Sequence, residues 1–133
     1  MKVSVIIPAY NEETKIIETI DSLRQALPMA ELIVVDDCSN DSTGALAASQ
    51  GVKVLSHDLN LGKAEALDTG LRNSTGEVVA MVDGDMGSCA REIAGLVSAV
   101  AFDNCDLAIA KFSSSKGGRS EEHTSELQSH HDL

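Results

Sequence analysis

The chain has 133 residues, a formal net charge of −11, and a composition that is 43% hydrophobic but only 2% aromatic. Its length suits one domain with a core of aliphatic side chains, and its acidity argues against nucleic acid, whose phosphates are bound by a basic face. A free nucleotide is not excluded, because a few amides, one lysine and a cation can hold it.

The predicted strands and helices alternate along the chain. In chain order they are a strand at 3–7, a helix from Asn11 to about Pro28, a strand at 31–35, a helix at 45–48, a strand at 52–55, a helix at 63–72, a strand at 78–82, a helix at 90–102 and a strand at 107–110. Asn11 is expected to cap the first helix and Gly51 to close the second. The alternation predicts an α/β fold whose mostly parallel sheet carries helices on both faces.

Polar clusters follow three of these strands. They are Tyr10-Asn11-Glu12 after the first, Asp36-Asp37 after the second and Asp83-Gly84-Asp85 after the fourth. Ligands of such sheets bind beyond the carboxyl ends of the strands, so the clusters predict one shared site. Asp83 and Asp85 are spaced to reach one divalent cation, which prefers oxygen ligands. A solvated turn is the alternative, since Asp and Gly are common in turns.

The residues after Phe112 do not continue this pattern. Residues 113–118 are rich in Ser and Gly, and residues 119–133 hold three of the four histidines with only two large apolar residues, Leu127 and Leu133. Such a stretch cannot bury a face, so disorder is expected over 113–133. Residues 119–133 also resemble the translation of a sequencing adapter, and we treat them as non-native. The predicted domain is residues 1–112.

Localisation is predicted from the cysteines and from the hydropathy pattern. Cys38, Cys89 and Cys105 form no CxxC pair, which is typical of small buried residues in a reducing cytoplasm. No run approaches the ~18 apolar residues that span a bilayer. We therefore predict a cytoplasmic protein with no membrane segment in this chain, and leave open a full-length parent at the cytoplasmic face of the membrane.

Four segments in order carry a family resemblance. Pro8–Glu12, Val35–Asp41, Asn60–Leu67 and Asp83–Asp85 together resemble the amino-terminal half of family-two inverting glycosyltransferases, which have the Rossmann-like GT-A fold. The resemblance covers about residues 1–112 and implies a truncated, donor-binding half of such an enzyme. The implied donor is a nucleoside-diphosphate sugar, with a UDP-sugar favoured, and the acceptor is unknown.

The resemblance also implies roles for individual residues. Those that would contact the nucleotide are Pro8, Ala9, Tyr10 and Glu12 around base and ribose, Asp37 at a base N–H, Gly62 and Lys63 at the diphosphate, and Asp83 and Gly84 at the ribose. Asp85, with Asp83, would hold Mg²⁺ or Mn²⁺. A capping turn at Asp37 and an ordinary exposed lysine at Lys63 remain the alternatives.

Two departures from the family limit the prediction. Cys38 stands where the family usually has glycine. The family's general base, a carboxylate that deprotonates the acceptor hydroxyl, lies beyond this segment, so no catalytic residue is assigned. Since general-base catalysis typically contributes ~10²–10⁴-fold, we expect this chain to bind the donor without efficient transfer.

Three other functions are weighed against this one. The first is a catalytically inactive nucleotide-binding fragment. The second is a sugar nucleotidyltransferase-like domain, which would need a basic, glycine-rich loop where this chain has Pro8–Glu12. The third is a phosphoacceptor receiver domain, whose acidic pair would follow the first strand, whereas Asp36 and Asp37 follow the second.

Overall fold

The computed structural model describes residues 2–92 and 107–111, which form an α/β fold with one β-sheet and flanking helices. Its elements are β1 (Val3–Ala9), α1 (Ile16–Ala26), β2 (Glu31–Asp36), α2 (Thr43–Ser49), β3 (Lys53–Ser56), α3 (Lys63–Arg72), β4 (Val78–Val82), the 3₁₀ helix η1 (Gly87–Glu92) and β5 (Leu107–Lys111). The predicted α/β fold class is confirmed. No helix in these two ranges is long and apolar enough to cross a bilayer.

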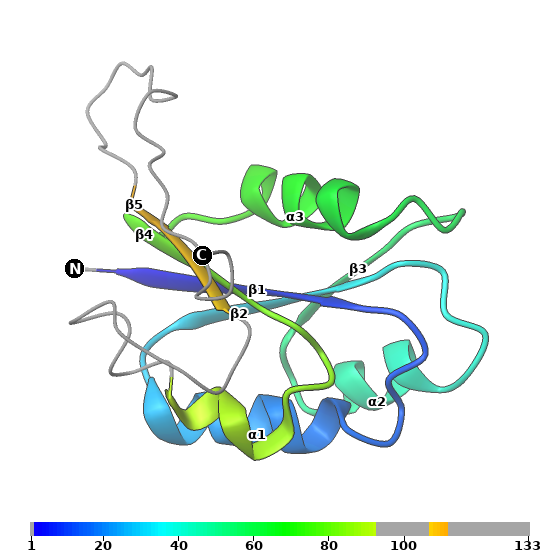
Figure 1. The fold of residues 1–133 in the computed structure, drawn as a ribbon, viewed down its shortest axis with the longest axis horizontal. Coiled ribbons are helices and arrows are strands. Elements are labelled where there is room, and N and C mark those ends of the chain that lie inside the picture. The colour runs from blue at the N-terminus through cyan, green and yellow to red at the C-terminus, as the bar shows by residue number, and fades with distance from the viewer. Residues whose placement is uncertain (1, 93–106, 112–133) are drawn as a thin grey trace.

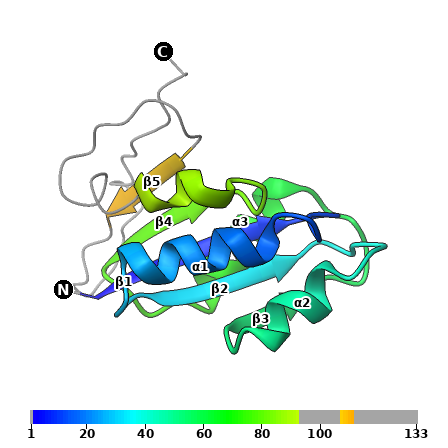
Figure 2. The same cartoon turned by 90° about the horizontal axis from the view of Figure 1, so that it is seen from below.

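The sheet places β1 at its centre, in the strand order β3-β2-β1-β4-β5. Neighbouring strands from β3 to β4 run parallel, and β5 pairs with β4 antiparallel. Helices α1, α2 and η1 cover one face of the sheet, while α3 covers the other (Figures 1 and 2). The predicted mostly parallel sheet with helices on both faces is therefore present.

The core lies on both faces of β1. On the side of α1 and α2, the fully buried side chains include Val5, Ile7, Ile16, Ile20, Leu23 and Val34. On the side of α3, they include Ile6, Ile33, Val35 and Ala66. Burial on both faces explains why the central strands read as continuous apolar runs rather than as alternating patterns.

The segment after β1 differs from its prediction. Helix α1 begins at Ile16, and Asn11 does not cap it but adopts a left-handed φ of 54°. The Asn11 side-chain oxygen instead accepts a hydrogen bond from the Asn40 amide at 2.8 Å, and the Glu12 carbonyl accepts the Ile16 amide at 2.9 Å. A contact distant in sequence therefore outweighs the local capping preference, and the chain crosses the sheet edge before the helix starts.

Other boundaries agree more closely. Helix α3 and strand β4 have the predicted bounds, and Gly51, with φ +80°, follows α2 in the left-handed conformation of a helix terminator. The helix predicted at 90–102 begins as the 3₁₀ helix η1, and its part from residue 93 lies outside the described residues. The predicted tail, 113–133, also lies outside them, and its boundary stays a prediction.

Gly70 of α3 sets how closely this helix approaches the sheet. A Cβ added at Gly70 would lie 2.4 Å from Ile6 Cγ2 and 2.9 Å from Ile6 Cγ1. In Gly70→Ala, overpacking costs about 1–3 kcal/mol and the better helix propensity of alanine returns ~1 kcal/mol, so we expect the free energy of unfolding to fall by up to about 2 kcal/mol. Urea denaturation measures this change.

The matched control is Glu65→Ala on the exposed side of the same helix, for which we expect a change within about 0.5 kcal/mol. A Gly70→Ala variant as stable as the wild type would show that α3 can move away from Ile6 without cost.

Candidate functional site

A cavity of about 260 Å³ opens at the carboxyl edge of the sheet. Its lining contains every residue that the sequence predicted for binding, and adds Asn60 and Ala66. The complete lining is Pro8, Ala9, Tyr10, Glu12, Asp37, Asn60, Gly62, Lys63, Ala66, Asp83, Gly84 and Asp85. The predicted convergence of the three polar clusters on one edge is thus what the structure shows.

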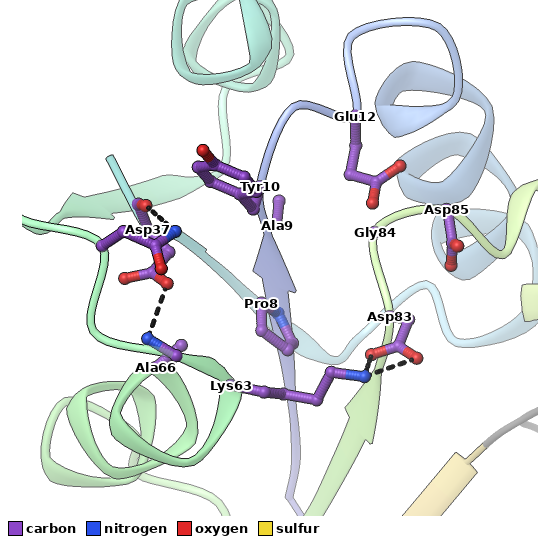
Figure 3. A pocket seen from close by; sticks show the side chains of 12 residues that line it. Pro8, Ala9, Tyr10, Glu12, Asp37, Lys63, Ala66, Asp83, Gly84 and Asp85 are labelled. Atoms are coloured by element: carbon purple, nitrogen blue, oxygen red, sulfur yellow. Dashed lines mark hydrogen bonds and ion pairs between the residues drawn. The ribbon is translucent and has the colours of Figure 1, made fainter. Parts of the chain in front are cut away.

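The end of β1 divides this cavity into two sides. In Figure 3, Pro8 and Ala9 lie between Asp37 on one side and Asp83 and Asp85 on the other. The Ala9 carbonyl accepts the Asp37 amide at 2.9 Å, and the Pro8 carbonyl accepts the Gly84 amide at 3.1 Å. The two backbone bonds attach both sides of the cavity to the same strand end.

Asp37 is held by the loop that precedes α3. Its Oδ1 accepts the Leu61 amide at 2.9 Å and lies 2.7 Å from His57 Nδ1, and its Oδ2 accepts the Gly62 amide at 2.8 Å. Its backbone carbonyl accepts the Asn60 side-chain amide at 3.2 Å. With 6% of its side chain exposed, Asp37 fixes this loop, yet a carboxylate oxygen accepts two bonds, so Oδ2 keeps capacity for another.

These contacts determine the ionisation of Asp37. Burial by itself would raise the pKa of its carboxyl group, but the hydrogen bonds from His57, Leu61 and Gly62 outweigh burial and bring the pKa below its ordinary value of 3.8. Asp37 is therefore a carboxylate at neutral pH.

His57 was not predicted as a site residue. Its Nε2 lies 2.8 Å from Thr69 Oγ1 while its Nδ1 faces Asp37, so the imidazole connects Asp37 to α3. One available signal was its position directly after β3, at the same sheet edge as the other polar clusters.

The opposite side of the cavity is acidic. Lys63 Nζ, at the start of α3, lies 3.1 Å from Asp83 Oδ1 and 3.2 Å from Asp83 Oδ2, and Figure 3 shows its side chain reaching across the cavity to that carboxylate. Lys63 is therefore paired, although 59% of its side chain is exposed. Asp85 lies beyond Gly84 and is exposed at the cavity wall.

Glu12 experiences the charge of this acidic side. Its pKa is raised above the ordinary value of 4.5, first by burial and then by the charges of Asp85 and Asp83, against the opposing effect of Lys63. Within residues 2–92 and 107–111, no three His, Cys, Asp or Glu side chains are grouped to hold a metal ion alone. The donor set fits a hard cation that shares its coordination with phosphate oxygens, as Mg²⁺ usually does.

Backbone conformation constrains both sides. A Cβ at Gly84 would lie 3.0 Å from Ala9 Cβ and 3.3 Å from Glu12 Cγ, so only glycine fits there unless its neighbours shift. Cys38 has φ +67°, in the left-handed region. That conformation costs a residue other than glycine roughly 1–2 kcal/mol, so a glycine would adopt it with less strain than Cys38 does.

Residues 4–131 match the model of a known protein family, which is described as "Glycosyl transferase family 2". Glucosyl-3-phosphoglycerate synthase of Mycolicibacterium smegmatis is 40% identical over 94 residues, covering 63% of this chain and 31% of its own length.

Two solved structures give the fold comparison. The mannosyltransferase PcManGT from Pyrobaculum calidifontis, in complex with GDP-Man and Mn²⁺, has a TM-score of 0.67 at 32% identity over 80% of this chain and 34% of its own. Glucosyl-3-phosphoglycerate synthase from Mycobacterium tuberculosis, in complex with Mn²⁺, UDP and glucosyl-3-phosphoglycerate, has a TM-score of 0.56 at 35% identity over 62% of this chain and 33% of its own. The chain thus spans about a third of these proteins.

The lowered pKa of Asp37 makes its contribution to stability depend on pH. The folded-state pKa lies below the ordinary 3.8, so the stabilisation is present above that value and is lost as the pH falls through the folded-state pKa. We expect Asp37→Asn to be less stable by about 1–3 kcal/mol at pH 7 and to lose less free energy of unfolding than the wild type on acidification.

Urea denaturation at a series of pH values down to the acid range measures both quantities. Asp58→Asn, at an exposed position in the same loop, is the control and should follow the wild-type curve. Parallel pH curves for Asp37→Asn and the wild type would contradict the structural assignment.

Proposed function

This chain belongs to glycosyl transferase family 2, and on that premise we propose that its cavity binds the donor, a nucleoside-diphosphate sugar. We further propose that the whole protein transfers the sugar to an acceptor hydroxyl with inversion and with dependence on a divalent cation. The observation that carries the proposal is the divided cavity, in which Asp37 lies on one side and the acidic turn with Lys63 on the other.

Asp37 is suited to the nucleotide base. A uracil imide N–H is a hydrogen-bond donor, and the Oδ2 atom of Asp37 accepts only the Gly62 amide among the bonds described above. A bond to an ionised acceptor is roughly twice as strong as a neutral one. Tyr10, 42% exposed at the cavity wall, would lie against the base or ribose. We favour a UDP-sugar, since neighbours such as the M. tuberculosis synthase bind UDP.

The acidic side is suited to the diphosphate. Lys63 places one positive charge in the cavity, and the carboxylates of Asp83 and Asp85 are the oxygen donors that would hold Mg²⁺ or Mn²⁺. When bound, the cation supplies the positive charge that stabilises the leaving nucleoside diphosphate. Lys63, which otherwise neutralises Asp83, would then face the phosphates as well. The complexes of PcManGT and of the M. tuberculosis synthase contain Mn²⁺, which supports this proposal.

The acceptor side is not assigned to any described residue. Because the family resemblance puts the general base beyond residues 1–112, we propose that this chain binds the donor and does not transfer its sugar efficiently. Donor binding and sugar transfer are distinguished by incubating the chain with a UDP-sugar, Mn²⁺ and candidate acceptors, and by measuring both the bound donor and the UDP released. Binding without turnover is the expected result, and rapid turnover would place a base within this chain.

Asp85 gives the direct test of the cation proposal. We expect Asp85→Ala to abolish the gain in UDP affinity that Mn²⁺ provides, because an exposed carboxylate oxygen donor is lost from the acidic side. Isothermal titration calorimetry with UDP, in Mn²⁺ and in EDTA, measures the gain.

Asp21→Ala, at an exposed position of α1 that does not line the cavity, is the matched control and should keep the wild-type gain. An unchanged Mn²⁺-dependent affinity in Asp85→Ala would refute the metal assignment.

A further inference from the structure

A buried hydroxyl group contacts the acidic turn from α1. Thr19 is fully buried, and its Oγ1 lies 2.9 Å from the Gly84 carbonyl oxygen and 3.0 Å from the Lys15 carbonyl oxygen. The Gly87 amide donates to the same Oγ1 at 2.8 Å. One side chain therefore contacts the turn that follows β4 at two points.

The hydrogen bonds of this hydroxyl can be assigned by counting donors. Oγ1 carries a single hydrogen, and it accepts the Gly87 amide with a lone pair. The Lys15 carbonyl already accepts the backbone amide of Thr19 at 2.9 Å within the helix. The hydroxyl hydrogen is therefore best used on the Gly84 carbonyl, which is also the closer oxygen.

The Gly84 carbonyl belongs to the peptide group that precedes Asp85. Because a peptide group is planar, fixing this carbonyl also fixes the orientation of the Asp85 backbone amide and limits the directions of its side chain. The Gly84 amide is fixed separately by the Pro8 carbonyl at 3.1 Å. The turn is thus bound to β1 on one side and to α1, through Thr19, on the other.

Close packing at Gly87 supports this attachment. Gly87 has φ +57°, and a Cβ there would lie 3.0 Å from Glu18 Oε1. The backbone after the acidic turn therefore runs directly against α1, and Figure 2 shows η1 beside that helix.

We propose that Thr19 is a positioning residue for the cation-binding carboxylates, acting through the Gly84–Asp85 peptide group. The inference rests on the proposed function of the cavity. No side chain of α1 lines the cavity, so the helix would contribute to binding indirectly, through Thr19. Loss of the hydroxyl should loosen the acidic side while leaving the Asp37 side intact. The Mn²⁺-dependent part of the UDP affinity should then fall, and the affinity in EDTA should not.

The test compares Thr19→Val, which replaces the hydroxyl with a methyl group of similar size, with Thr19→Ser, which keeps the hydroxyl. Calorimetry with UDP in Mn²⁺ and in EDTA is the first readout. We expect Thr19→Val to lower the Mn²⁺-dependent affinity about 10- to 100-fold, the usual effect of removing a group that orients a metal ligand, and Thr19→Ser to stay near the wild type. If Thr19→Val does not fold, Thr19→Ala against Thr19→Ser gives the same contrast.

The second readout needs no ligand. Amide hydrogen exchange at Gly87 should be faster in Thr19→Val than in the wild type and should be restored in Thr19→Ser. Unchanged exchange, equal Mn²⁺-dependent affinities, or equal losses in the Val and Ser variants would overturn the role of Thr19. Faster exchange in a chain whose wild type shows no Mn²⁺-dependent UDP binding would instead refute the proposed function of the cavity, and with it the cation-binding part of this inference.

Discussion

The central position of β1 is the constraint on which the site depends. The strand is buried on both faces and pairs in parallel with β2 and β4. The segments that follow these three strands must therefore meet at one edge of the sheet. Successive carbonyls at the end of β1 point to opposite neighbours, so Pro8 binds the Gly84 amide and Ala9 binds the Asp37 amide. Two short backbone bonds thus set the spacing between the two sides of the cavity.

The two sides of the cavity differ in how far the protein's own groups stabilise the charges of their carboxylates. Asp37 is surrounded by donors that lower its pKa despite its burial, whereas burial, followed by the charges of Asp85 and Asp83, raises the pKa of Glu12. The Asp37 side is therefore organised without a ligand. On the acidic side, Lys63 is the only basic residue of the cavity lining that offsets the carboxylates. The electrostatic stabilisation from a bound cation, which would also contact the phosphates of the ligand, is therefore greatest on this side. This asymmetry is the electrostatic basis of the proposed donor site.

Part of this architecture could be predicted from the sequence, because it depends on local patterns. Apolar periodicity predicted the bounds of α3 and β4, and the polar residues after the first, second and fourth strands predicted the cavity. The contacts that connect distant segments could not be predicted in this way. Asn11 is bonded to Asn40 rather than to a helix end, and Thr19 occupies a helical position whose role depends on a turn 65 residues away. The antiparallel direction of β5 is likewise not encoded in its short apolar run.

The most direct test of the central claim is to map the ligand onto the chain by amide NMR, using UDP with Mg²⁺ and then trace Mn²⁺. A second cavity, of about 270 Å³ at the opposite edge of the sheet, is lined by residues that include Gly51 and Lys53, and it serves as an internal control. We predict shifts confined to residues 8–12, Asp37, 60–66 and 83–87, with Mn²⁺ broadening strongest in the last segment. Shifts at the opposite edge, or none at saturating UDP, would contradict the account.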